Sequence, residues 1–212
     1  KGTLAWNNNH LNRAIFPSSG YSHQASLEVS VPGSDLSYYK ALYQTKWYKP
    51  FFDDSGWVLG LKGRLGYAQS YGDNTYPFFK HFFAGGLRTV RGFANNSLGP
   101  RDSNGDPFGG NLMAVGGAEL IFPLPFIENQ SGWRSLFFVD GGNVFTTECL
   151  SSTSAASLCE EGIQFEEMRY SAGLGVSWLS PLGPLSFSVA KALNEKVVDD
   201  TELFQFSLGQ SF

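Results

Sequence analysis

The stretch Tyr21-Ser22-His23-Gln24-Ala25-Ser26-Leu27-Glu28-Val29-Ser30-Val31 decides the fold class of this chain. Its odd positions form an apolar face and its even positions a polar face, and this period of two is typical of a β-strand with one buried side. The alternation recurs along the chain, whereas helical periodicity is nearly absent. It predicts nine strands, the first of them partial, at residues 3–9, 21–31, 39–47, 57–67, 111–122, 133–145, 169–178, 185–189 and 203–212.

Two all-β architectures share this alternation: a soluble sandwich and an antiparallel up-and-down barrel that spans a membrane. Strands of about ten residues suit a tilted membrane span. One face of nearly every strand is aromatic or aliphatic. The other carries Ser, Gln, Gly and charges, which a sandwich core would not tolerate but a wet lumen would. The pattern therefore favours the transmembrane β-barrel, with inward-pointing charges at Glu28, Lys40, Lys46, Lys62, Arg64, Glu119, Arg134, Asp140 and Arg169.

The composition argues against several other classes of protein. The chain has 212 residues, enough for one domain, and a formal net charge of −4. No basic run or basic face indicates nucleic acid as a partner. No window approaches about twenty uninterrupted apolar residues, so we expect no membrane-spanning helix. The start at Lys1, without a signal peptide, indicates a mature or truncated fragment.

The longest gap between predicted strands, residues 70–110, holds the candidate functional motif Val90-Arg91-Gly92-Phe93. The gap is rich in phenylalanine, which argues against a disordered loop. The odd or even position of a residue along its strand, which we call its parity, decides the face to which its side chain points. Parity places Glu119 and Asp140 on the lumen side of adjacent strands, within reach of a loop that folds inward. Two interpretations of the residues remain open. Either Arg91 pairs with both acids inside the lumen, or Arg91 is solvated and the acids line a channel.

The motif segment resembles the signature of the BamA family, the central subunits of the machinery that folds and inserts β-barrel proteins into the bacterial outer membrane. The match rests on Thr89-Val90-Arg91-Gly92-Phe93 followed by Asn96-Ser97-Leu98-Gly99-Pro100, and it extends over essentially the whole chain. The other matching segments are Leu11-Asn12-Arg13 before Phe16-Pro17, Pro32-Gly33-Ser34-Asp35 before Tyr38-Tyr39-Lys40, Ser180-Pro181-Leu182-Gly183-Pro184, and Phe204-Gln205-Phe206-Ser207-Leu208-Gly209-Gln210-Ser211-Phe212.

The resemblance implies that residues 1–212 are the C-terminal eight to nine strands of a sixteen-stranded barrel, without its N-terminal strands and periplasmic POTRA domains. It implies a place in the bacterial outer membrane, among lipid and lipopolysaccharide, with a periplasmic C-terminus. The implied partners are unfolded outer-membrane proteins and, through the POTRA domains, assembly-complex lipoproteins. In the family the motif arginine is held inside the barrel by acids of the next two strands, which are Glu119 and Asp140 here.

The last strand is implied to form one side of a lateral seam. In the family the first and last barrel strands pair weakly, and substrate strands add to the exposed edge. The apolar residues of this strand are Phe204, Phe206, Leu208 and Phe212, and Gly209 would permit a kink. The terminal Phe212 also matches the aromatic C-terminal signal of outer-membrane barrels. An ordinary barrel strand with such a signal is the alternative, because the strand alone identifies no insertase.

Two cysteines, Cys149 and Cys159, lie in a segment rich in Ser and Thr that is typical of an exposed loop. We expect a loop-closing disulfide rather than a reactive thiol pair or half of a metal site, because no His or further Cys lies nearby. The sequence indicates no metal or cofactor. Of its three histidines, His23 falls on the outer, apolar face of its strand, and His10 and His81 have no nucleophile or acid in register, so we expect no enzyme activity.

Two related functions compete with the insertase hypothesis. A two-partner-secretion transporter belongs to the same superfamily and carries a related arginine-glycine loop motif, and a passive pore would share the barrel. Conductance and a single dedicated exported partner would distinguish them. For the isolated chain we also expect that its eight complete strands close into a small barrel, because unpaired strand edges are costly in lipid.

Overall fold

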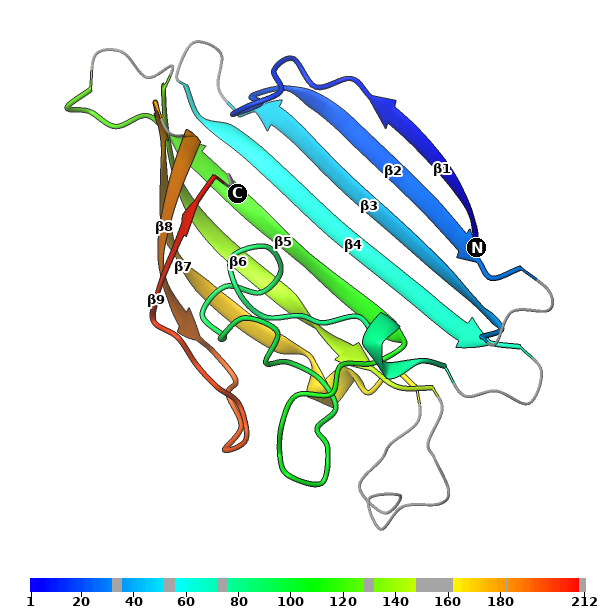
Figure 1. Cartoon of the computed structure of the whole chain (residues 1–212). Helices are drawn as coiled ribbons and strands as arrows, with labels where there is room; N and C mark the ends of the chain where they lie inside the picture. Colours follow the sequence, from blue (N-terminus) through cyan, green and yellow to red (C-terminus); the bar gives the residue numbers. More distant parts are fainter. Residues whose placement is uncertain are drawn as a thin grey trace.

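The computed structural model describes residues 1–31, 36–51, 56–71, 76–127, 132–147, 162–181 and 183–209. In these residues, nine antiparallel strands form a single sheet in chain order, which confirms the predicted all-β up-and-down architecture (Figure 1). The strands are β1 (Gly2–Asn9), β2 (Gly20–Val29), β3 (Tyr38–Pro50), β4 (Val58–Ser70), β5 (Leu112–Phe122), β6 (Trp133–Phe145), β7 (Arg169–Ser180), β8 (Gly183–Ala192) and β9 (Phe204–Leu208).

In the part of the chain that the structure describes, two 3-10 helices, η1 (Phe78–Lys80) and η4 (Phe165–Glu167), lie in the connections between strands. Within the described ranges, no helix has the length and apolar character needed to cross a membrane.

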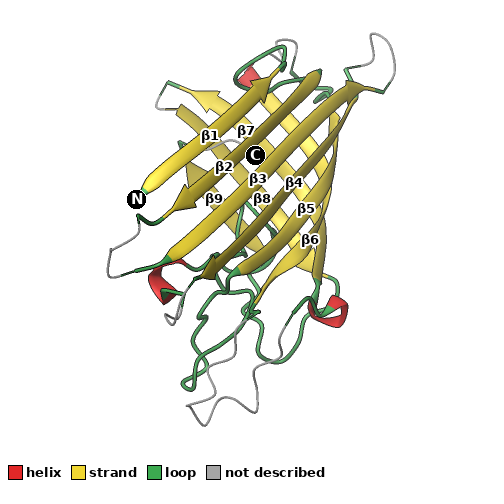
Figure 2. Ribbon diagram, turned by 90° about the vertical axis from the view of Figure 1, so that its right-hand side faces the viewer, coloured by secondary structure: helices red, strands yellow, loops and turns green. Residues whose placement is uncertain are grey.

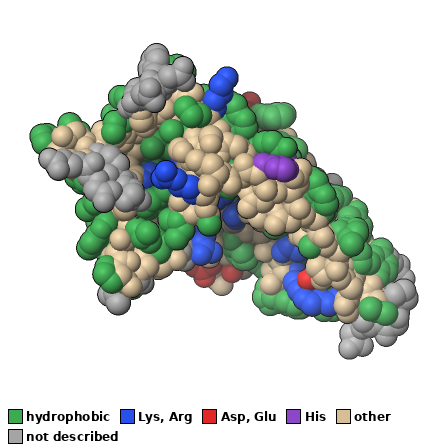
Figure 3. Space-filling view, turned by 90° about the horizontal axis from the view of Figure 1, so that it is seen from above, with side chains coloured by type: hydrophobic (Ala, Val, Ile, Leu, Met, Phe, Trp, Pro, Cys, Tyr) green, Lys and Arg blue, Asp and Glu red, His purple; other side chains and the backbone are tan. Residues whose placement is uncertain are grey.

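The two faces of the sheet differ as the alternation predicts. The convex outer face exposes apolar side chains, while the concave inner face buries Ser, Gln and charged residues. Figure 3 shows the molecule from above the view of Figure 1. Hydrophobic side chains lie around the rim, and charged side chains appear in the central hollow. Exposed outer residues include Leu27, Trp47, Leu61, Leu65, Phe137, Leu174, Trp178, Phe187 and Phe206. This is the reverse of a soluble protein, whose core is apolar.

The connections separate into two kinds at opposite ends of the sheet (Figure 1). At the turn end, strands are joined through residues 10–19, 51–57, 123–132 and 181–182, and at the loop end through residues 30–37, 71–111, 146–168 and 193–203. The longest of these, which we call the motif loop (76–110), folds back into the concave side of the sheet (Figure 2). Its residues Val90, Arg91 and Phe93 are fully buried there.

The expected closure into a small barrel is wrong. In the described residues β1 pairs with β2 alone and β9 with β8 alone. Closure of the eight complete strands would join β2 to β9, but the eight residues of β1 occupy that edge of β2. Because nine alternating strands begin and end in the same direction, β1 cannot complete an antiparallel ladder with β9. The sheet therefore remains an open trough around the motif loop.

The last strand is shorter than predicted. It was expected to run from residue 203 to residue 212, but β9 ends at Leu208. Gly209 follows with φ of 80°, a left-handed conformation that ends the extended strand. No atom lies within 4 Å of a Cβ placed on Gly209, so packing does not impose this bend. Phe212 lies outside the described residues, as do Cys149 and Cys159, and their predicted roles stay predictions.

Candidate functional site

The motif arginine binds both acids that parity selected. Arg91 Nε donates a hydrogen bond of 2.6 Å to Oδ2 of Asp140, and Nη2 donates one of 2.8 Å to Oδ1 of the same carboxylate. Nη2 also donates to Oε1 of Glu119 at 2.9 Å. The backbone N–H of Arg91 adds a bond of 3.2 Å to Asp140. The fork of the guanidinium therefore spans two neighbouring strands, which fixes the loop tip in position and direction.

The register of the sheet places the two acids side by side. Glu119 lies on β5 and Asp140 on β6, both on the inner face. Asp140 is paired across the ladder with Gly117, which precedes Glu119 by one inner-face position. A Cβ on Gly117 would lie 2.3 Å from Oδ1 of Asp140. Because Gly117 has no side chain, the carboxylate of Asp140 has room to lie over β5, where it contacts Arg91.

Two further residues complete this cluster, and sequence reasoning had not assigned them to it. Lys62 of β4 places Nζ 3.0 Å from Oε1 of Glu119 and 3.7 Å from Oδ1 of Asp140. The guanidinium carbon of Arg91 lies 3.5 Å from the centroid of the Phe138 ring, a cation–π contact. Parity had placed Lys62 in the lumen, but no sequence signal distinguished it from the other inward lysines.

The charges of the Arg91 site, which comprises Arg91, Glu119, Asp140 and Lys62, balance inside a buried space. Arg91 and Asp140 are 0% exposed and Glu119 is 2% exposed. Burial opposes the charge of Arg91, but the hydrogen bonds and charges of Asp140 and Glu119 outweigh it and raise the pKa of the guanidinium. Removal of one partner from such a buried group costs about 3–5 kcal/mol, because the other charge stays behind. The site can therefore hold a long loop in one geometry.

The rest of the motif contacts the wall of the trough. Gly92 has φ of 88°, and a Cβ there would lie 3.1 Å from Cβ of Ala190 on β8. A side chain at this position would crowd Ala190, and it would need a left-handed backbone conformation that residues other than glycine rarely adopt. Val90 and Phe93 are fully buried in the apolar cluster between the motif loop and the sheet. The four motif residues thus form one compact tip.

A second cluster holds the start of the motif loop, and we call it the Lys80 site (Lys80, Glu28, Tyr38 and Lys1). Nζ of Lys80 donates a hydrogen bond of 2.9 Å to Oε1 of Glu28. The hydroxyl of Tyr38 donates to the same oxygen at 2.6 Å, and Nζ of Lys1 to Oε2 at 3.0 Å. The side chain of Lys80 is 26% exposed and that of Glu28 19%, so water reaches this cluster.

The residues predicted for the seam point away from the Arg91 site. Phe204, Phe206 and Leu208 are exposed on the outer face of β9. Gln205, between them, points inward and is buried. Within the described residues, no group of three or more His, Cys, Asp or Glu side chains is arranged to hold a metal ion.

Comparison with known proteins assigns this architecture to a family. The model of the Omp85 superfamily domain matches residues 1–212, the whole chain. The chain belongs to the Omp85 superfamily. The predicted resemblance to the BamA family is confirmed within it, because the chain is 36% identical over its full length to outer membrane protein assembly factor BamA of Neisseria meningitidis serogroup B.

Further relatives match over different shares of the chain. Sorting and assembly machinery component 50 homolog of Mus musculus is 34% identical over 63% of the chain. The crystal structure of BamA from Haemophilus ducreyi lacking POTRA domains 1–3 superposes with a TM-score of 0.88 and 36% identity, over 96% of this chain and 41% of that one. The chain spans only 28% of the Neisseria protein and 29% of the mouse protein. A sheet taken from a wider barrel covers only part of the circumference, which is consistent with the open trough.

Proposed function

We propose that residues 1–212 are the C-terminal part of the membrane barrel of an assembly factor that folds and inserts β-barrel proteins into the bacterial outer membrane. The observation that carries the proposal is the 36% identity to BamA of Neisseria over the whole of this chain. The Arg91 site adds support, because it holds the motif loop inside the trough where it lies against the sheet. The proposal treats the chain as a non-enzymatic insertase that uses no cofactor.

The distribution of side chains supports the membrane orientation. The exposed apolar face would contact lipid and lipopolysaccharide, and the charged inner face would line the lumen. Outer-membrane barrels have short periplasmic turns and longer outer loops. Because β9 runs from the loop end to the turn end, the C-terminus would lie on the periplasmic side. Lipoproteins of the assembly complex would bind through POTRA domains of a longer protein.

Strand addition at the edge of β9 is the proposed mechanism. A strand edge with unpaired N–H and C=O groups is a template for another chain. In the described residues, β9 pairs with β8 over five positions, from Phe204 to Leu208, and with no other strand. An unfolded outer-membrane protein would add its strand there. The short ladder makes this edge easier to open than the longer ladders of the interior of the sheet.

Reconstitution tests the proposal. A full-length protein that contains this chain, with its POTRA domains, is placed in liposomes, and an unfolded outer-membrane protein is added. We expect the substrate to acquire protease resistance faster than in empty liposomes, and Arg91→Ala to remove most of that gain. Arg101→Ala, in the same loop, is the control, because Arg101 pairs with the largely exposed Asp200. Equal substrate folding with and without the protein would reject the assembly function.

The same liposomes separate the assembly factor from its rivals. A passive pore would conduct ions steadily without accelerating substrate folding. A two-partner-secretion transporter would move one dedicated substrate across the bilayer without inserting it. Residues 1–212 by themselves should not assemble substrates, because the proposed seam needs a first strand as well as a last one. Insertion by the fragment alone would contradict the seam mechanism.

A further inference from the structure

The segment that leads into β9 pairs with the motif itself. Phe93 and Thr201 form an antiparallel bridge. The N–H of Ala94 donates to the carbonyl of Asp200 at 2.8 Å, and the N–H of Glu202 donates to the carbonyl of Gly92 at 2.9 Å. The motif is therefore bound on two sides: Arg91 holds it to β5 and β6, and its next residues hold the chain that becomes β9.

Gln205 strengthens this connection from within β9. Its Nε2 donates a hydrogen bond of 2.7 Å to the carbonyl of Phe93, and its Oε1 accepts one of 3.3 Å from the N–H of Gly92. The side chain is 3% exposed, so both bonds are made where water cannot replace them. A primary amide is suited to this position, because it offers a donor and an acceptor to the backbone of two consecutive residues.

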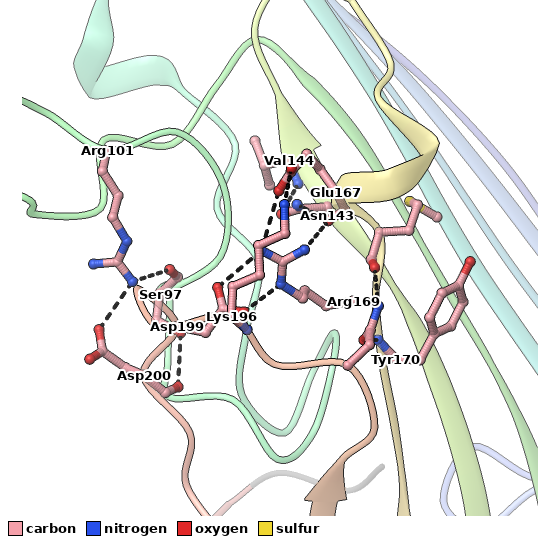
Figure 4. A network of polar contacts seen from close by, with 12 residues as sticks. Ser97, Arg101, Asn143, Val144, Glu167, Arg169, Tyr170, Lys196, Asp199 and Asp200 are labelled. Carbon is pink, nitrogen blue, oxygen red and sulfur yellow. Dashed lines mark hydrogen bonds and ion pairs between the residues drawn. The ribbon is translucent and has the colours of Figure 1, made fainter. Parts of the chain in front are cut away.

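The segment that leads into β9 also contacts β7. Nε of Arg169 donates a hydrogen bond of 2.5 Å to Oδ2 of Asp199, and Nη2 donates one of 3.3 Å to Oδ1 (Figure 4). Both side chains are nearly fully buried. Lys196 contacts Glu167 beside them. Residues 199–205 thus lie between the motif loop and the start of β7, whereas β9 itself is held in the sheet by only five ladder positions.

We propose that Gln205 is a positioning residue that couples the Arg91 site to the edge strand β9. When Arg91 is bound to Asp140 and Glu119, the backbone of Gly92 and Phe93 is fixed, and Gln205 transmits that position to β9. When Arg91 is released, β9 loses the support of the motif and is held by its short ladder with β8 and, through Asp199, by Arg169. The importance of this coupling for substrate entry rests on the proposed function. The coupling itself is a property of the fold.

Hydrogen exchange on the full-length protein in lipid nanodiscs tests the coupling. The measured quantity is the exchange rate of backbone amides in residues 200–206. We expect Arg91→Ala and Gln205→Leu each to raise it about tenfold or more. Gln205→Leu removes both hydrogen bonds to the motif, and a tenfold change corresponds to about 1.4 kcal/mol, the order of one buried hydrogen bond. The double variant should exchange no faster than the more affected single variant, because both changes break the same connection.

Ser207→Ala is the matched control. Ser207 lies on the inner face of the same strand but has no hydrogen bond with the motif, so its substitution should change the rate by about twofold or less. Arg91→Lys, which keeps the charge but lacks the fork, replaces Arg91→Ala if that variant does not fold. Multiplicative effects in the double variant, or no change in the single variants, would overturn the coupling.

Substrate folding in liposomes is measured on the same variants. If no variant of the protein, including the wild type, accelerates substrate folding while the exchange rates remain coupled, the proposed function fails and the coupling stands. If wild-type assembly is normal and the exchange effects are independent, the coupling fails and the proposed function stands.

Discussion

The motif loop is held at its start and at its tip by ion pairs between a basic side chain and carboxylates, in different surroundings. At the tip, Arg91 contacts Asp140 and Glu119 in a space closed to water. At the start, Lys80 contacts Glu28 near the rim, where both side chains are partly exposed. The distances are similar, 2.6–2.9 Å at the tip and 2.9 Å at the rim. The comparison shows that burial, rather than the presence of a salt bridge, decides what each contact can fix.

The difference also affects what happens when one partner is lost. A charge left alone at the rim is solvated, so the loss is small. A carboxylate left alone at the Arg91 site keeps its desolvation cost without its compensating bonds. We therefore expect that loss of a partner at the tip displaces the loop there. Loss of a partner at the start of the loop should leave the loop in place.

Removal of the buried guanidinium should have the largest effect. Among the described residues, Arg91→Ala leaves Lys62 as the cation in contact with Glu119 and Asp140, and we expect a loss of about 3–5 kcal/mol in the free energy of unfolding. Urea unfolding of the full-length protein in lipid bilayers measures it. Arg101→Ala should lose about 1 kcal/mol or less. Similar losses for the two arginines would remove the distinction between buried and exposed pairs.

A methyl group placed beside Asp140 should have an intermediate effect. Gly117→Ala puts a Cβ at 2.3 Å from Oδ1 of Asp140, so the carboxylate must move away from Arg91. We expect a loss of about 1–3 kcal/mol, the usual range for overpacking. The same urea measurement applies, with Gly132→Ala as the control, because a Cβ at Gly132 meets no atom within 4 Å. An unchanged unfolding midpoint for Gly117→Ala would show that Asp140 has room to adjust.

Neutralisation of the rim contact should have a small effect. Lys80→Met keeps the aliphatic stem and removes the ammonium from Glu28, which retains Tyr38 and Lys1 as hydrogen-bond donors. We expect about 1 kcal/mol or less, and a decrease of that difference at high salt. A loss as large as that of Arg91→Ala would mean that exposure at the rim does not screen the pair.

Alkaline titration should separate the two sites with the smallest change in stability. The hydrogen bond with Glu28 raises the pKa of Lys80 above its usual value of 10.5. The contribution of Lys80 is therefore fully present below pH 10.5 and is lost as pH rises through the raised pKa. The pKa of Arg91 is raised as well, so the tip keeps its charge over this window. Exchange rates measured between about pH 10 and pH 12, after correction for intrinsic exchange, should increase around Lys80 before they increase around Arg91.

Local patterns in the sequence predicted most of the fold. Alternation predicted the approximate positions of most strands, because the side chains of a strand point to opposite faces whatever surrounds it. It missed the early end of β9, since the left-handed conformation of Gly209 is a property of one backbone angle that glycine permits but does not require. It also missed the open edge, because closure depends on which strand occupies the edge of β2.

The candidate site was predicted in part for the same reason. Parity alone put Glu119, Asp140 and Lys62 on the inner face, and the motif resemblance joined Arg91 to the two acids. The contact with Lys62 and the stacking on Phe138 follow from the depth at which the loop tip enters the trough. The residue pattern along a single strand cannot predict how deeply the loop tip enters the trough.

The sequence by itself determined which side chains share the outer face of the sheet and which share the inner face, because a period of two fixes the direction of side chains along each strand. Only the tertiary structure decided which inward-facing residues meet. The register of β5 and β6 set Asp140 over Gly117, and the path of the motif loop brought Phe93 to Gln205, which is 112 residues later in the chain. Contacts between such distant residues depend on how the whole sheet curves around the loop, which is a physical property of the assembled sheet and of no single segment.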